Sequence, residues 1–359
     1  MQSVRPIGRA LLIGVAAVTF AAACGGSTTP TTSSVGSGAL TGAGSTFDNP
    51  LFSKAFYDYT LQYPQVKVNY QPVGSGAGIQ QFIKNTVDFG ATDVPMGSSD
   101  IASAGGPATL VQVPVTLGAV AIAYNLPGVA RLHVDGPTLA NIYLGHIKTW
   151  NDPALTALNP GVNLPSSSIT VAHRSDGSGT TYIFTDYLAK VSPEWMTKVG
   201  VAKSVSWPVG VGGSGNQAVA QAITSTPGAI GYVELAYVVQ AGMSQAYVKN
   251  ANGQFLQASV AGATAAAAQN NNISATNFSI TNEPGDTTYP IAGFSWVILR
   301  TSYSDAGKGK AVVYLFKWLV TTGQSEGVAL QYSPLPPAVQ SLALTNLKQI
   351  TAGGAVVLS

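Results

Sequence analysis

The chain has 359 residues, of which 17 are basic and 15 acidic, and it contains a single cysteine. This near balance of charge excludes the concentrated basic field that binding to nucleic acid or to anionic lipid requires. One cysteine provides neither an internal disulfide framework nor a thiolate metal cluster. The length predicts two lobes or one large domain.

Residues 1–39 have the pattern of an export signal followed by a tether. Arg5 and Arg9 precede an apolar run over residues 10–23, which is too short to span a bilayer comfortably, and Cys24 follows directly. The end of this run resembles the lipobox of bacterial lipoproteins, although Ala21 stands where such boxes usually have Leu. Ordinary signal peptidase cleavage after Ala23 is the alternative. We therefore expect a signal peptide over residues 1–23, lipidation of Cys24, and an exported protein anchored to the cell membrane and facing the periplasm or the cell exterior.

Residues 24–39 contain no charged side chain and few apolar ones, so they predict a flexible tether. The folded part is expected to begin near Leu40. Without Arg5 and Arg9, the remaining 15 basic residues match the 15 acidic ones, and Arg174 is one of only three arginines left. An anion would therefore have to be bound by local dipoles and hydrogen bonds, because no general positive field is available.

From Leu40 onward, short apolar runs alternate with amphipathic segments, which is typical of an α/β fold. The runs that predict strands are 66–70, 86–91, 119–124, 169–172, 229–233 and 294–299. The segments that predict helices are 50–61, 78–85, 137–144, 180–190, 216–225 and 311–321. The stretch 261–275, rich in Ala and Asn, is compatible with either a helix or a loop.

Three segments rich in glycine and hydroxyl residues stand at the starts of predicted helices. They are 42–47 (Gly-Ala-Gly-Ser-Thr-Phe), 74–78 (Gly-Ser-Gly-Ala-Gly) and 173–181 (His-Arg-Ser-Asp-Gly-Ser-Gly-Thr-Thr). Each alone is typical of a plain helix cap. Together they favour an anion site, because glycines admit a ligand close to the backbone and the N–H groups of a helix start point at it. Arg174 adds a planar fork of donors that suits a phosphate-like oxyanion.

A carboxylate follows the strand predicted at 86–91. Asp93 ends the run Val-Asp-Phe-Gly-Ala-Thr-Asp over residues 87–93. A carboxylate repels a fully ionised anion, so at an oxyanion site it makes sense only for a ligand that carries a proton. Monohydrogen and dihydrogen phosphate carry such a proton, whereas sulfate does not. The alternative is an exposed aspartate that caps a turn.

The sequence resembles the phosphate-binding subunit of bacterial phosphate ABC importers. The segments that carry the resemblance occur in family order: 40–47 (LTGAGSTF), 74–76 (GSG), 85–93 (NTVDFGATD), 142–145 (IYLG) with Thr149-Trp150, 174–180 (RSDGSGT) and 227–234 (PGAIGYVE). The resemblance implies a type II periplasmic-binding-protein-like fold, with two α/β lobes joined by a hinge of two crossings and the ligand in the cleft. We expect lobe 1 to comprise residues 40–118 and 290–359, lobe 2 to comprise 119–289, and the hinge to lie near 117–120 and 289–292.

The same resemblance implies high-affinity binding of inorganic phosphate outside the cytoplasmic membrane. It further implies delivery to the permease and ATPase subunits of an ABC importer, a monomeric protein, no cofactor and no nucleic acid.

Carried over position by position, the resemblance assigns ligand contacts to both lobes. The implied contacts are the Thr46 hydroxyl, the Phe47 backbone N–H, Ser75 and the acceptor carboxylate of Asp93 in lobe 1, and Arg174, Ser178, Gly179 and Thr180 in lobe 2. Asp176 is implied as the partner that orients Arg174. Two positions depart from the family pattern: Gly76 replaces a frequent serine, and Asp48 replaces a frequent proline. We expect Asp48 to add a charge near the cleft mouth.

Three other functions are compatible with parts of the sequence. Residues 210–215 match the dinucleotide pattern G-x-G-x-x-G, but Pro208 interrupts the preceding strand, and a glycine-rich turn or a cleft-lining loop is preferred. Sulfate or another tetrahedral oxyanion is an alternative ligand, with Asp93 as the discriminator. A phosphate-ester hydrolase on the same fold would need an activated nucleophile or metal ions, and His133, His146 and His173 show no metal-ligand spacing. We therefore expect no catalytic and no metal-binding residues.

Overall fold

The computed structural model describes residues 35–359. The predicted signal peptide, Cys24 and residues 24–34 of the predicted tether lie outside the described residues. Val35 is buried and the first strand begins at Gly38, so the described fold starts a few residues before Leu40.

Nine strands of the described chain form one sheet. Their bounds are β1 Gly38–Gly44, β2 Val66–Gln71, β3 Phe89–Thr92, β4 Leu110–Asn125, β6 Thr170–Arg174, β7 Val211–Gly213, β8 Ala229–Glu234, β9 Ser244–Gln245 and β12 Ala292–Arg300. They lie in the order β2-β1-β3-β12-β4-β8-β6-β7, with β9 beside β4. β1 pairs parallel with β2 and β3, and β6 pairs parallel with β7 and β8. The segments that follow these parallel strands therefore leave each group at a common edge.

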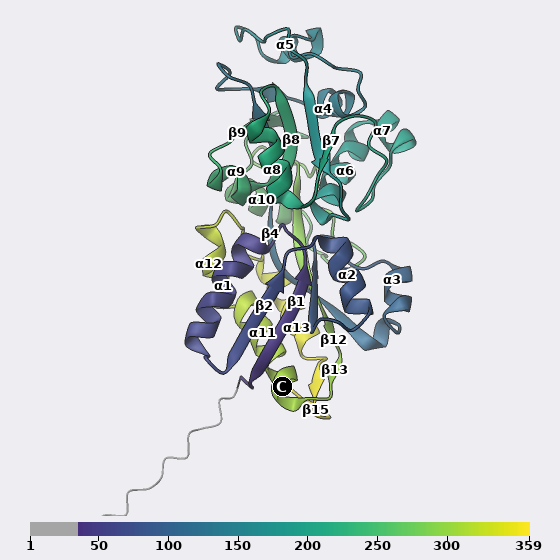
Figure 1. Ribbon diagram of the computed structural model, residues 1–359, viewed down its shortest axis with the longest axis vertical. Helices are drawn as coiled ribbons and strands as arrows, with labels where there is room; N and C mark the ends of the chain where they lie inside the picture. The colour runs from purple at the N-terminus through teal and green to yellow at the C-terminus, as the bar shows by residue number, and fades with distance from the viewer. Residues whose placement is uncertain (1–34) are drawn as a thin grey trace, which may run out of the picture. The chain divides into compact units, whose positions relative to one another are not determined.

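The long strand β4 connects the two groups of parallel strands (Figure 1). Its first part pairs with β12, from Leu110 opposite Arg300 to Ala119 opposite Ala292, and its second part pairs with β8 from Val120 onward. All of its residues except the last are buried, which is typical of a central strand. The sequence predicts only the second part, because Pro114 and polar side chains interrupt the apolar run of the first. The register between β4 and β12 shifts between Ser295, opposite Thr116, and Trp296, opposite Pro114, so that Val115 is the extra residue of a bulge next to the proline.

Helices cover the faces of this sheet (Figure 1). Their bounds are α1 Asn49–Gln62, α2 Ser75–Ile83, α3 Ser98–Ser103, α4 Gly136–Tyr143, α5 Pro153–Leu158, α6 Gly179–Val191, α7 Pro193–Lys198, α8 Gly215–Ser225, α9 Leu235–Gln240, α10 Val260–Ala267, α11 Ala306–Val320, α12 Gln324–Val328 and α13 Pro337–Leu347. The six predicted helices correspond to α1, α2, α4, α6, α8 and α11 and are confirmed. The stretch 261–275 is resolved as the helix α10 followed by a loop. In the part of the chain from Val35 on, no helix combines the length and apolarity needed to cross a bilayer.

Short strands complete the structure as two small sheets. One contains β5 His133–Val134, β10 Tyr247–Lys249 and β11 Phe255–Leu256, and the other contains β13 Ser302–Tyr303, β14 Thr351–Ala352 and β15 Ala355–Val356. A large apolar cluster runs through the whole fold, with Trp150, Trp195 and Trp296 among its fully buried side chains.

The helix α2 begins three residues earlier than the sequence predicts. Gly74 has a φ of 92°, which lets the chain turn directly into the helix at Ser75. Gly78 lies inside the helix because the helix packs closely on β1: a Cβ at Gly78 would come within 2.3 Å of the Gly44 Cα. Ser75 is therefore a residue of the first helical turn, where backbone N–H groups lack helical partners.

Candidate functional site

Buried polar side chains meet where the segments after β1, β3, β6 and β7 approach one another. Thr46 follows β1, Asp93 follows β3, Arg174 ends β6, and α8 begins shortly after β7. Direct hydrogen bonds join the two groups of strands here. The Gly179 N–H donates to Ser75 Oγ at 3.1 Å, and the Gly76 N–H donates to the Gly177 carbonyl at 2.8 Å. The structure therefore brings the starts of α2 and α6 into contact.

Arg174 is buried and held in one orientation by Asp176. Its Nε donates to Asp176 Oδ1 at 2.7 Å and its Nη2 donates to Asp176 Oδ2 at 2.5 Å. Its Nη1 lies 3.5 Å from Thr180 Oγ1, which is a long hydrogen bond to a weak acceptor. Asp176 also accepts the Gly215 N–H at 3.1 Å. The pairing with Asp176 thus fixes one side of the guanidinium and directs Nη1 toward the start of α6.

The pKa of Asp176 reflects this pairing. Burial by itself raises the pKa of Asp176, but the hydrogen bonds and the charge of Arg174 outweigh that effect and hold it below its ordinary value. Asp176 is therefore ionised at neutral pH, and it offsets the charge of Arg174 next to the site.

Four hydroxyl residues that the sequence analysis assigns to the site accept hydrogen bonds through their side chains. Thr46 Oγ1 accepts from the backbone N–H of Asn216 at 3.1 Å and from its Nδ2 at 3.0 Å. Ser75 Oγ accepts from Gly179, Thr180 Oγ1 accepts from Asn216 Nδ2 at 3.2 Å, and Ser178 Oγ accepts the Thr181 N–H at 3.0 Å. In the described structure, none of these four hydroxyls donates to a protein acceptor. Since each hydroxyl has one hydrogen, four hydroxyl hydrogens remain available for an acceptor that the protein does not supply.

Two predicted backbone donors are already engaged. The Phe47 N–H donates to Ser45 Oγ at 3.0 Å, and the Ser178 N–H donates to the Lys203 carbonyl at 2.8 Å. The Ser178 N–H therefore anchors the loop at Lys203, and only the hydroxyl of Ser178 keeps a hydrogen for another acceptor. The Ser178 hydroxyl caps α6 while keeping its own hydrogen.

Asp93 lies buried against the start of α6, with only 2% of its surface exposed. Its Oδ1 accepts from Ser45 Oγ at 2.5 Å and from Ser295 Oγ at 2.8 Å, and its carboxylate also accepts the Thr180 backbone N–H. Burial raises the pKa of Asp93 to about 6, against the opposing effects of these hydrogen bonds and of the Arg174 charge. The alternative of an exposed turn cap is wrong, because the side chain has almost no contact with solvent.

Close approach of backbone explains two glycines of the site. A Cβ at Gly179 would lie 2.4 Å from the Asp93 Cβ, so any larger residue would collide with the acidic side chain. A Cβ at Gly76 would lie 3.1 Å from the Gly177 Cα, across the contact between α2 and the segment before α6. A serine at this position would crowd Gly177.

Asn216 and Ser295 belong to the site, but no sequence motif marks them. Asn216 bridges Thr46 and Thr180 and accepts the Glu234 N–H at 3.0 Å, and Ser295 on β12 contacts Asp93. Asn216 follows the glycine-rich stretch 210–215, which forms the strand β7 and the turn into α8, in agreement with the glycine-rich turn that was one of the two preferred interpretations. The N–H groups of Gly215 and Asn216, at the start of α8, already donate to Asp176 and Thr46 and are therefore not free for a dinucleotide.

The expectation for Asp48 is wrong. Asp48 adds no charge at a cleft mouth, because its side chain is completely buried beside Ser295 and Asp93. The physical reason is that the chain turns inward between β1 and α1, so that Phe47 and Asp48 both face the interior.

The histidines have structural surroundings. His173 stacks on Trp207 with ring centroids 4.7 Å apart, and its Nδ1 contacts the Arg174 carbonyl at 3.0 Å. His146 pairs with Glu194 on the surface, and His133 stacks on Phe255. Among residues 35–359, no group of three or more His, Cys, Asp or Glu side chains is arranged to hold a metal ion.

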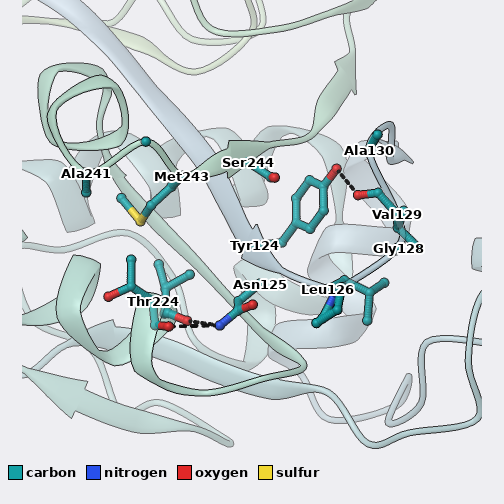
Figure 2. Close-up of a pocket in the computed structure, with 13 residues that line it drawn as sticks. Tyr124, Asn125, Leu126, Gly128, Val129, Ala130, Thr224, Ala241, Met243 and Ser244 are labelled. Atoms are coloured by element: carbon teal, nitrogen blue, oxygen red, sulfur yellow. Dashed lines mark hydrogen bonds between the residues drawn. The ribbon is translucent and has the colours of Figure 1, made fainter.

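Figure 2 shows a separate hollow of about 470 Å³ at the C-terminal end of β4. Asn125 Nδ2 donates to the carbonyls of Ile223 and Thr224 there, and the Tyr124 hydroxyl donates to the Val129 carbonyl. No lining residue is charged. The hollow begins at Tyr124, four residues along β4 from Val120, which pairs with Glu234. This is about 13 Å along the strand. It does not provide a site for an anion.

A larger hollow of about 770 Å³ borders the polar site. Val94, next to Asp93, lines it together with Asp100 of α3 and Lys203. Lys203 Nζ contacts Asp100 Oδ2 at 3.1 Å across this hollow.

Comparison with known proteins identifies the family. A profile described as PBP superfamily domain matches residues 28–316. The phosphate-binding protein PstS of Xylella fastidiosa (strain 9a5c) is 44% identical over 319 residues, which cover 87% of this chain and 86% of that protein. PstS of Haemophilus influenzae is 41% identical over 318 residues, covering 86% and 94%. The solved structure of a phosphate-binding protein from Stenotrophomonas maltophilia matches with a TM-score of 0.65 at 20% sequence identity. The match covers 86% of this chain and 94% of that one, and at this identity it shows a likeness of fold.

The fold is thus the α/β fold of periplasmic-binding-protein-like proteins, as the sequence predicts. The chain belongs to the PBP superfamily and, within it, to the PstS family of phosphate-binding proteins.

Proposed function

We propose that this protein binds inorganic phosphate in its protonated forms and delivers it to the permease and ATPase subunits of a phosphate ABC importer. The observation that carries the proposal is the set of four hydroxyls at Thr46, Ser75, Ser178 and Thr180 whose hydrogens have no protein acceptor. An oxyanion with several acceptor oxygens satisfies these hydrogens together with Nη1 of Arg174. Relatives that are named phosphate-binding proteins support the choice of oxyanion.

Asp93 supports the choice of a protonated ligand. With a pKa of about 6, Asp93 is mostly ionised at neutral pH, and it can accept a hydrogen bond from the O–H of monohydrogen or dihydrogen phosphate. Sulfate has no such hydrogen and would place its charge against an unpaired carboxylate. The protein binds phosphate without transforming it. The proposed contacts also include Phe47 and Gly179, whose N–H groups would exchange their present acceptors, Ser45 and Ser75, for the ligand.

We also propose that the chain forms two lobes, residues 40–118 with 290–359 and residues 119–289, which close around the ligand. The support is that β4 changes its pairing partner at this point. It pairs with β12 up to Ala119, which lies opposite Ala292, and it pairs with β8 from Val120 onward. A hinge near 117–120 and 289–292 would let the bonds between Gly76 and Gly177, and between Ser75 and Gly179, open and re-form.

The location of the protein is proposed from its first residues. The basic and apolar pattern before Cys24 supports export, and the cysteine supports a lipid anchor on the outer side of the cell membrane. Mass spectrometry of the protein from its native membrane would detect the lipid on Cys24. An unmodified Cys24 at the N-terminus, which ordinary signal peptidase cleavage after Ala23 would leave, would exclude the anchor.

Calorimetric titration with phosphate and with sulfate at neutral pH tests the proposal. We expect phosphate to bind with micromolar or tighter affinity, since charge-assisted hydrogen bonds contribute about 1.5–3 kcal/mol each and about 8 kcal/mol corresponds to a micromolar constant. We expect no signal for sulfate. Binding of neither anion would refute the proposed ligand, and equal binding of both would refute the role of Asp93.

Matched variants localise the binding. We expect Asp93→Asn to gain sulfate binding, because the amide removes the opposing charge. Asp286→Asn is the control, since Asp286 is exposed and contacts only Asn252 through its side chain. Small-angle scattering with and without phosphate tests closure: identical profiles would contradict the two-lobe mechanism.

A further inference from the structure

Asp48 is a buried carboxyl that the binding of phosphate does not directly require. It precedes α1, and its side chain is 0% exposed. Its Oδ2 lies 2.6 Å from Ser295 Oγ, while its Oδ1 has no hydrogen-bond partner. A buried ionised carboxylate with one unpartnered oxygen is strongly unfavourable, whereas a neutral carboxylic acid tolerates the same surroundings at lower cost.

The hydrogen count at Ser295 shows that one carboxyl in this group carries a proton. Ser295 Oγ lies 2.6 Å from Asp48 Oδ2, 2.8 Å from Asp93 Oδ1 and 3.3 Å from the Thr92 carbonyl. The hydroxyl has one hydrogen and can donate it to only one of these oxygens. If both aspartates were ionised, one carboxylate oxygen would face a lone pair of Ser295 at hydrogen-bond distance. A proton on one of the two carboxyls removes that conflict, because its O–H then donates to Ser295.

The surroundings of the two aspartates decide which of them holds this proton. Asp93 is stabilised as an anion by the Ser45 hydroxyl, by the Thr180 N–H and by the charge of Arg174. Asp48 has none of these partners. The titratable groups around Asp48 are Asp93, the buried Glu234, and the hydroxyls of Tyr70, Tyr237 and Tyr332. None of these groups is a cation.

The pKa directions agree with this assignment. Burial and the neighbouring Asp93 raise the pKa of Asp48 well above its ordinary value, with Ser295 opposing them, whereas that of Asp93 rises to about 6. The proton therefore resides on Asp48 when the pair binds a single proton.

We propose that Asp48 is a neutral carboxylic acid that donates to Ser295 Oγ and thereby directs the Ser295 hydrogen to Asp93. Asp48 and Ser295 are then positioning residues for the acceptor. With Ser45 and Ser295 both donating to Oδ1, Asp93 stays anionic and is fixed with its Oδ2 beside the start of α6, where Gly179 lies. The consequence for ligand choice rests on the proposed phosphate function, while the protonation of Asp48 does not.

Carbon-13 NMR of the ligand-free protein, labelled at the aspartate carboxyl carbons, tests the protonation directly. We expect one aspartate signal at the position of a protonated acid that does not titrate between about pH 5 and about pH 8. Asp48→Asn should remove that signal. An Asp48 signal at the ionised position, or one that titrates in this range, would overturn the proposal whether or not the protein binds phosphate.

The titration of Asp93 in the same variant provides a second readout. If Asp48 is neutral, replacing it with a neutral amide should move the Asp93 midpoint by less than about half a pH unit. If Asp48 is ionised, removing that like charge should lower the Asp93 midpoint by about one unit or more, which would contradict the proposal.

Ser295→Ala tests the positioning role. We expect the Asp93 midpoint to rise, because the anion loses a donor, and the dissociation constant for phosphate at neutral pH to increase about tenfold. Thr185→Ala is the matched control, since Thr185 is also buried and its hydroxyl contacts only the backbone of Tyr182 and Ala202, within residues 119–289. An unchanged Asp93 midpoint and an unchanged phosphate affinity in Ser295→Ala would refute the positioning role, even with Asp48 protonated.

Discussion

Replacement of Gly179 by alanine tests whether contact between α6 and Asp93 is needed to close the site. A Cβ at Gly179 would lie 2.4 Å from the Asp93 Cβ and 2.5 Å from its Oδ2. Carbon atoms in good contact are about 3.5–4.0 Å apart, so one side of the contact must retreat by about 1 Å. The methyl group therefore acts as a wedge between α6 and the end of β3.

Neither side of this contact can yield freely. Asp93 Oδ1 is held by Ser45 and Ser295, and the Gly179 N–H is bound to Ser75. Overpacking of a well-packed region costs about 1–3 kcal/mol. If that cost falls on the closed form alone, phosphate binding weakens by roughly 5- to 150-fold, because each 1.4 kcal/mol is a factor of about ten.

Calorimetric titration of Gly179→Ala with phosphate measures this loss. Gly97→Ala is the matched control, because Gly97 stands before α3 with a φ of −75° and its added Cβ would meet nothing within 4 Å. We expect the control to keep its affinity within about twofold. Thermal unfolding of both variants separates a loss of closure from a general loss of stability. An unchanged dissociation constant in Gly179→Ala would refute the reasoning.

Three further predictions concern the buried polar groups. Because the pKa of Asp93 is about 6, lowering the pH from about 8 to about 5 should neutralise the Asp93 carboxylate and allow sulfate to bind. Calorimetric titrations with sulfate across that pH range measure this change. Rejection of sulfate at every pH would contradict the prediction. Asn216→Ala removes the Nδ2 donor to Thr46 and Thr180. The free energy of unfolding in urea should therefore fall by about 1–3 kcal/mol, and phosphate binding should weaken about tenfold. An unchanged urea midpoint would count against this prediction. Burial raises the pKa of Glu234 well above its ordinary value, so the folded protein retains a proton there that the unfolded chain loses above about pH 4.3, and wild-type stability falls as the pH rises. The Glu234→Gln variant has no such proton to lose, so its free energy of unfolding relative to wild type should increase from about pH 5 to about pH 8. Urea unfolding of both proteins at the two pH values measures this difference. The same difference at both pH values would contradict the inference.

Local sequence signals were sufficient for the parts of the site that belong to one segment. Glycine and hydroxyl residues at a helix start predict an anion-binding arrangement because the backbone of that same segment supplies the donors. In the segment 173–181, Ser178 caps α6 as such a pattern predicts, whereas the pairing of Arg174 with Asp176 was implied only by the family resemblance. The apolar spacing likewise predicted α1 and α6 to within a few residues.

Contacts between distant segments left no comparable signal. Ser295 lies 202 residues from Asp93, and Asn216 lies 170 residues from Thr46, so their meeting depends on the whole sheet order. A serine inside an apolar strand and an asparagine at a helix start are both common without any ligand. The first part of β4 was missed for a related reason: a strand containing Pro114 is stabilised by its neighbours and the bulge, which local propensity does not describe.

The arrangement around Arg174 explains how a chain with little net charge can select an anion. Asp176 already offsets the guanidinium, and Asp93 adds a negative charge on the other side of the site. Charge alone would therefore not attract phosphate to this place. What remains attractive is the direction of the donors: four hydroxyl hydrogens and Nη1 of Arg174 have no good protein acceptor, while the ionised Asp93 carboxylate can accept a hydrogen bond. A ligand must both accept many hydrogen bonds and donate one, and that combination distinguishes a protonated oxyanion from a fully ionised one of the same shape.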